Sequence, residues 1–142
     1  MSAFSEVRRA EVVDRAGYRC EYCHIPTRGQ VATFPIDHVV PRSAGGENGV
    51  ENLALTCPGC NANKWIQTAV PDVLTGLTVQ LFHPRHDDWT KHFAWSIESF
   101  GELVGLTPTG RATVTALRIN DADSIALRLL LNEVGLFPDL HS

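Results

Sequence analysis

The chain has 142 residues, of which 44% are hydrophobic and 20% are charged, a composition typical of one globular domain. Its formal net charge of −4 argues against tight binding of nucleic acid through bulk charge alone. The N-terminal segment carries Glu6, Arg8 and Arg9 and no apolar run, and no stretch reaches the roughly 18 apolar residues of a membrane span. We therefore expect no signal peptide, no membrane partner and a cytoplasmic location.

The charge is unevenly distributed along the chain. Residues 1–66 contain seven basic and seven acidic side chains, whereas residues 67–142 contain five basic and nine acidic ones. The second half therefore supplies the whole negative charge, and a local basic rim in the first half can still meet a phosphate.

A helix is predicted at the start of the chain, from Ser5 to Gly17. Ser5 is a favourable N-cap, and Gly17 is a favourable residue just beyond the C-terminus. Apolar residues at helical spacing predict the buried face of this helix: Val7, Ala10, Val13 and Ala16.

A β-hairpin followed by a helix is predicted next. Val31–Val40 is rich in β-branched and aromatic residues, although Pro35 limits its pairing, and Val50–Thr56 brings the chain back. Asn61–Ile66 is expected to begin a short helix, with Trp65 in the core.

The remainder is predicted to form a small α/β extension, so the fold class is α+β. Thr68–Pro71 is expected to mark a seam between a unit at 1–66 and an extension at 67–142. The predicted strands and helices of the extension are Leu77–Phe82, Phe93–Ile97, Glu102–Leu106, Pro108–Ile119 and Asp121–Val134. In the last helix, Ile125, Leu129 and Leu130 are expected near one face.

Four cysteines stand in two Cys-x2-Cys pairs, Cys20 with Cys23 and Cys57 with Cys60. This spacing in a reducing compartment predicts a closed four-thiolate site for a structural zinc ion. Two other metal sites share parts of the pattern. Cys20 to His24 matches a c-type haem attachment sequence, and Cys57-Pro58-Gly59-Cys60 is similar to an iron-binding rubredoxin knuckle.

The segment between and after these pairs resembles the HNH endonuclease family, with its ββα-metal fold. The resemblance rests on Ile36 to Pro41, Gly45-Gly46, Glu51 to Leu53 and Cys57 to Lys64, and it covers about Gly17 to Trp65. Asn61 stands where the family name has its final histidine, which makes the chain an H-N-N variant.

The resemblance implies divalent-metal-dependent hydrolysis of DNA phosphodiester bonds, leaving 3′-hydroxyl and 5′-phosphate ends. Hydrolysis needs a base, and the neutral imidazole of His38 can accept a proton near neutral pH. Asp37 and Asn61 offer oxygen ligands that suit Mg²⁺ or Mn²⁺. Asn52 is expected to bridge the backbone across the loop and to fix the His38 ring.

The substrate phosphate is expected to meet two basic side chains, Lys64 and Arg42. One feature opposes a regular backbone at the site, because neighbouring residues of a strand point to opposite faces. Asp37 and His38 can therefore enter one cavity only at a strand end or a bulge.

Some assignments stay open on the sequence alone. A non-catalytic zinc module that binds nucleic acid or protein is the rival function. The segment containing His83, His86 and His92 could form a second metal site, or a loop whose aromatic side chains pack on the rest of the protein. Because one site cuts one strand, double-strand cleavage would suggest a homodimer or sequential nicks.

Overall fold

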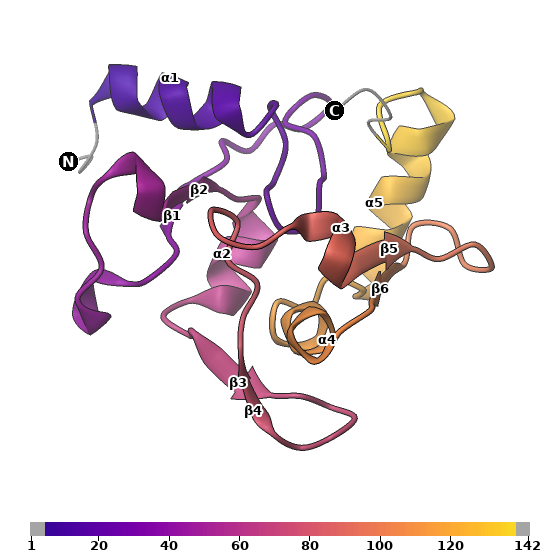
Figure 1. Ribbon diagram of the computed structural model, residues 1–142. Helices are drawn as coiled ribbons and strands as arrows, with labels where there is room; N and C mark the ends of the chain where they lie inside the picture. Colours follow the sequence, from indigo (N-terminus) through magenta and orange to yellow (C-terminus); the bar gives the residue numbers. More distant parts are fainter. Residues whose placement is uncertain (1–4, 139–142) are drawn as a thin grey trace.

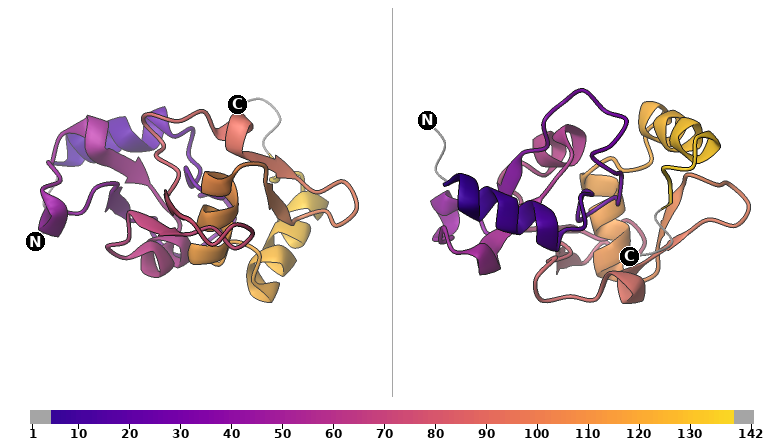
Figure 2. Two further views of the ribbon diagram at one scale, coloured as in Figure 1. Left: turned by 60° about the horizontal axis from the view of Figure 1, so that its bottom comes forward. Right: turned by 90° about the horizontal axis from the view of Figure 1, so that it is seen from above.

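The computed structural model describes residues 5–138 of the chain. Helices alternate with short antiparallel strand pairs, so the predicted α+β class is confirmed. Figure 1 and Figure 2 show α1 and α5 at opposite ends of the molecule, with α4 between them. Among residues 5–138, no helix is long and apolar enough to span a membrane.

The first helix, α1 (Glu6–Arg15), begins where its sequence predicts. The Ser5 hydroxyl accepts a hydrogen bond from the Arg8 amide at 3.1 Å, and Gly17 has a φ of 69° just beyond the helix. The predicted buried face is wrong in part, because Val7 is 82% exposed while Val12 is fully buried. The helix is rotated so that Val12 and Ala16 pack into the core.

The hairpin and helix predicted for the middle of the chain are present, although the strands are short. β1 (Ile36–His38) pairs antiparallel with β2 (Leu53–Leu55), and α2 (Pro58–Lys64) follows. The link between the strands contains two 3₁₀ turns, η1 (Arg42–Ala44) and η2 (Val50–Asn52). All three residues of β2 are buried, which makes this strand the centre of the unit.

Most of the segment expected to mark a seam, Thr68–Pro71, forms a strand. β3 (Ala69–Pro71) pairs antiparallel with β4 (Thr78–Gln80), and the hairpin between them is tied to a later helix. The guanidinium of Arg111 donates two hydrogen bonds to the Asp72 carboxylate, both at 3.0 Å. This two-point contact fixes the hairpin to α4.

The rest of the extension follows the predicted order. It contains α3 (Trp89–His92), β5 (Phe93–Trp95) paired with β6 (Leu103–Gly105), α4 (Pro108–Ala116) and α5 (Ala122–Glu133). α4 packs closely on the strand pair, since a Cβ built at Gly105 of β6 would lie 2.3 Å from the Arg111 amide nitrogen of α4.

The buried face of α5 is not the apolar face noted in the sequence. Leu129 and Leu130 are exposed, whereas Arg128 and Leu131 are buried. Arg128 is satisfied inside the protein because its guanidinium donates to the carbonyls of Gly101 and Ile119, both at 2.6 Å. Hydrophobic periodicity cannot predict a buried arginine, because a charged residue in a helix is assigned to the exposed face.

One hydrophobic cluster contains residues from both halves of the chain. Tyr22, Leu53 and Leu55 belong to it together with Phe82 and Phe93. Polar contacts cross the same boundary: the Trp89 indole donates to the Tyr22 carbonyl at 2.9 Å, and the Arg85 guanidinium pairs with the Glu21 carboxylate. The extension therefore packs directly on the segment that carries the first cysteine pair.

Candidate metal-dependent hydrolytic site

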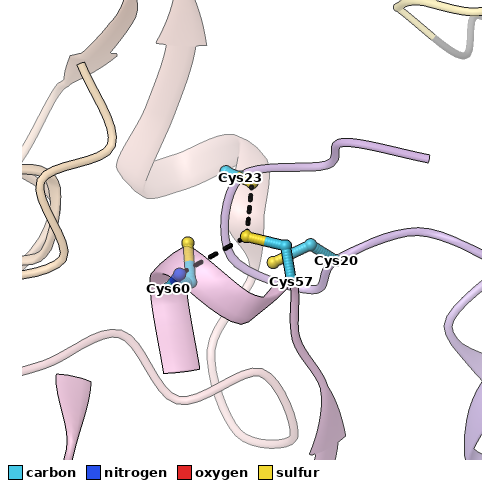
Figure 3. A group of neighbouring side chains, drawn as sticks. All are labelled: Cys20, Cys23, Cys57 and Cys60. Atoms are coloured by element: carbon cyan, nitrogen blue, oxygen red, sulfur yellow. Dashed lines mark hydrogen bonds between the residues drawn. The ribbon is translucent and has the colours of Figure 1, made fainter. Parts of the chain in front are cut away.

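The four cysteine sulfurs converge on one point. Their Sγ atoms all lie within 4.8 Å of one another, and the two pairs face each other across the end of α2 (Figure 3). Cys23 Sγ and Cys57 Sγ are 3.8 Å apart. Zinc–sulfur bonds of about 2.3 Å in a tetrahedron give sulfur–sulfur edges of roughly 3.8 Å. The donor set and its spacing thus fit a four-thiolate metal site.

Local backbone structure explains how each pair is formed. Cys57 is the N-cap of α2, where its sulfur accepts a hydrogen bond from the Cys60 amide at 3.4 Å, and Pro58 occupies the first turn. In the other pair, the Cys20 carbonyl accepts the His24 amide at 2.9 Å, closing a tight turn around Cys23. Both pairs are therefore preorganised by turns that their own residues close.

The thiols share protons unequally when no metal is bound. Burial raises the pKa of Cys20, whereas hydrogen bonds from neighbouring thiols lower the pKa of Cys57. Four thiolates are needed for a closed zinc site, so zinc binding is coupled to the release of thiol protons.

Asp37, His38 and Asn61 line one pocket of about 370 Å³. Asp37 is buried and His38 is half-buried. His38 is the last residue of β1, which is the strand-end position that the sequence argument required for two neighbouring side chains to reach one cavity. Asn61 comes from the second turn of α2, directly after the cysteine that ends the knuckle.

Lys64 lies in a different environment from the one predicted. Its side chain is 1% exposed, and its ammonium is 3.1 Å from Asp37 Oδ2 and 3.2 Å from the His38 carbonyl oxygen. The sequence predicts that this ammonium meets a substrate phosphate, which requires an accessible position. Lys64 lies one helical turn after Asn61 as predicted, but its side chain points into the protein because the buried Asp37 carboxylate lies within its reach.

Asp37 is held by a second donor from the first cysteine knuckle. The Tyr22 hydroxyl donates to Asp37 Oδ2 at 3.2 Å. Burial raises the pKa of Asp37, and the nearby Lys64 ammonium opposes that rise. Burial also raises the pKa of Tyr22, so the phenol remains a donor. Tyr22 and Lys64 connect the two metal-binding knuckles to the end of β1.

Asn52 bridges the backbone of the loop between the strands. Its amide nitrogen donates to the carbonyls of Val40 and Glu47, and its oxygen accepts the Val40 amide, at 2.8–2.9 Å. The loop passes so close that a Cβ at Gly46 would lie 1.7 Å from the Val40 carbonyl oxygen. The predicted backbone bridge is therefore present.

The His38 ring itself contacts a different asparagine. His38 Nε2 lies 2.8 Å from Asn48 Oδ1, a contact that the sequence analysis did not predict. Asn48 was missed because a lone asparagine in a Gly-rich loop normally serves only as a turn residue. Asn52 can influence the ring only through the loop, since its own amide is engaged with backbone.

The other predicted residues lie apart from this centre or at its edge. Arg42 is exposed and lines the pocket. The rings of His83 and His86 stack with centroids 3.8 Å apart, and His92 Nδ1 contacts the Thr107 hydroxyl at 2.6 Å. Within residues 5–138, the four cysteines form the sole cluster of three or more His, Cys, Asp or Glu side chains that could hold a metal.

Comparison with known proteins agrees with this geometry. Residues 20–65 match the family model described as HNH endonuclease. No curated protein matches the chain. The matched residues contain both cysteine pairs, the strand end at His38 and all of α2. The segment from residue 20 to residue 65 is thus similar to the HNH endonuclease family, and it contains four cysteines placed so that they could hold a metal ion.

Proposed function

We propose that this protein is a divalent-metal-dependent endonuclease that hydrolyses DNA phosphodiester bonds. The observation that carries the proposal is the meeting of Asp37, His38 and Asn61 in one pocket within the HNH segment. These side chains offer a proton acceptor that can activate water, and an anionic and a neutral oxygen that can hold a divalent cation, the two contributions used in metal-assisted phosphodiester hydrolysis.

His38 acts as the general base. When Nε2–H donates to Asn48 Oδ1, the other ring nitrogen, Nδ1, is left as the proton acceptor. Asn48 therefore selects the tautomer and holds the ring while Nδ1 takes a proton from the attacking water.

Asp37 and Asn61 would hold the divalent ion, Mg²⁺ or Mn²⁺. A carboxylate has about four lone-pair sites, and Asp37 uses its oxygens for the Tyr22 hydroxyl and the Lys64 ammonium, so it retains capacity for a cation. Such an ion supplies charge stabilisation for the phosphate and the leaving oxygen. With one anionic ligand already paired to Lys64, we expect weak metal binding in the absence of DNA.

The residues around Asp37, His38 and Asn61 bind the substrate or support these three side chains. Arg42, exposed at the rim of the pocket, contacts the substrate phosphate. Lys64 neutralises and orients Asp37 from within the protein rather than binding DNA. Zinc in the four-cysteine site is structural, because four sulfur ligands leave no open coordination position.

The test is a cleavage assay on supercoiled, linear and single-stranded DNA, with Mg²⁺, Mn²⁺ or Ca²⁺ added to the zinc-loaded protein. Nicking of supercoiled plasmid with Mg²⁺ or Mn²⁺ is the expected result, and linear product in one step would indicate a homodimer. Binding of DNA without cleavage under every metal condition would favour the rival function, a non-catalytic zinc module.

A further inference from the structure

Trp65 occupies a backbone position that normally requires glycine. It follows the last residue of α2 with φ 50° and ψ −121°, and the Gln67 amide donates to the Lys64 carbonyl at 2.9 Å to close the turn. These angles are those of the first central residue in a type II′ turn, which favours Gly, Asn or Asp. A bulky side chain there costs free energy that a glycine would not.

Burial does not explain the presence of this tryptophan. The sequence predicts Trp65 in the core, but its side chain is 71% exposed. The next residue, Ile66, is 46% exposed. A strained, exposed aromatic residue followed by an exposed aliphatic one contributes little to folding, so another role must be sought.

Both residues lie at the candidate active site. Trp65 and Ile66 line the same pocket as Asp37, His38 and Arg42. The pocket therefore combines an apolar aromatic wall with the proposed catalytic side chains. The indole is held beside this site by the turn that closes on Lys64, whose own side chain is fixed by Asp37.

We infer that Trp65 stacks on an unpaired nucleobase next to the phosphate to be cut, so that the preferred substrate contains a single-stranded or extruded nucleotide. This inference rests on the proposed nuclease function and specifies its substrate class. Bases inside a duplex have both faces covered by their neighbours, whereas an unstacked base offers a face to an aromatic ring. The net charge of −4 limits electrostatic affinity, and stacking supplies affinity that does not depend on charge.

Binding is tested first without Mg²⁺ or Mn²⁺, so that no cleavage occurs. Fluorescence anisotropy compares a labelled oligothymidylate strand with a labelled blunt hairpin duplex. Trp65→Leu is expected to weaken single-strand binding by roughly 5- to 150-fold, the range of one base–aromatic stack, while duplex binding changes little. Trp65→Phe keeps an aromatic face and should retain most of the affinity.

Leu74→Ala is the matched control, because Leu74 is 73% exposed in the loop between β3 and β4 and does not line the pocket. Wild-type tryptophan emission should be quenched by oligothymidylate, and the quenching should disappear in Trp65→Leu. Single-strand binding unchanged in Trp65→Leu, or an equal loss on both substrates, would overturn the inference.

A cleavage assay separates this inference from the proposed function. Trp65→Leu should lose the wild-type preference for DNA with an unpaired loop, measured as the ratio of the cleavage rates on looped and plain duplex DNA with Mg²⁺ or Mn²⁺, whereas Leu74→Ala should keep that ratio. Wild type that cleaves plain duplex and looped DNA equally would refute the stacking role and leave the nuclease intact. Quenching by single strands without any cleavage would refute the nuclease and support the stacking surface.

Discussion

Replacing Lys64 with methionine tests the buried ion pair that holds Asp37. The Lys64 and Asp37 side chains are 1% and 6% exposed, so solvent does not screen their contact. Methionine keeps the apolar stem but removes the ammonium, which leaves the Asp37 charge and the His38 carbonyl without this donor. Breaking a buried pair in this way costs about 3–5 kcal/mol of unfolding free energy.

Urea unfolding of the zinc-loaded protein at neutral pH measures this cost. Adding Asp37→Asn to the Lys64→Met variant should restore much of the lost stability, because both buried charges are then absent. Lys91→Met, at an exposed lysine in α3, should change stability by less than about 0.5 kcal/mol.

The pH dependence gives a second check on the same variant. Burial raises the pKa of Asp37, so the protonated form is favoured by folding, and the cost of ionisation appears as the pH rises above the unfolded value of about 3.9. The deficit of Lys64→Met should therefore shrink as the pH falls toward 4. A loss below about 1 kcal/mol, with no recovery on adding Asp37→Asn, would mean that Lys64 is a solvated residue available to phosphate.

Two further predictions concern His24 and the metal. Burial lowers the pKa of His24, which stacks on Trp89, to about 3. A depressed pKa stabilises the fold above the unfolded value of about 6.5, so stability should fall by about 2 kcal/mol from pH 7 to pH 5, and His24→Gln should flatten that slope in urea unfolding. Elemental analysis should find one zinc per chain, and the visible spectrum should show no absorption band. Cys23→Ser should lose zinc and have a lower unfolding temperature. A coloured iron protein would contradict the zinc assignment.

The sequence was sufficient for features set by local chemistry. The cysteine spacing predicted the sulfur cluster, Ser5 and Gly17 predicted the ends of α1, and the order of the hairpin and α2 followed from turn and strand patterns. These features depend on residues close together in the chain, where propensity and capping have direct effects.

The failures arose where a long-range contact changed the environment of a side chain. Lys64 looked like a surface cation, but Asp37 lies 27 positions away in sequence and draws it inward. Arg128 is buried for the same kind of reason, through carbonyls of Gly101 and Ile119. Trp65 looked like a core residue, and only its backbone conformation and exposure distinguish it from one.

The most direct test of the account is the single-turnover nicking rate of wild type and His38→Ala with Mg²⁺ or Mn²⁺. Both proteins must first contain equal zinc, so that a folding defect is not mistaken for lost chemistry. Loss of a general base predicts a rate reduced by about 10²- to 10⁴-fold, while His86→Ala, at an exposed histidine, keeps the wild-type rate. Cleavage that continues unchanged in His38→Ala would contradict the proposed mechanism.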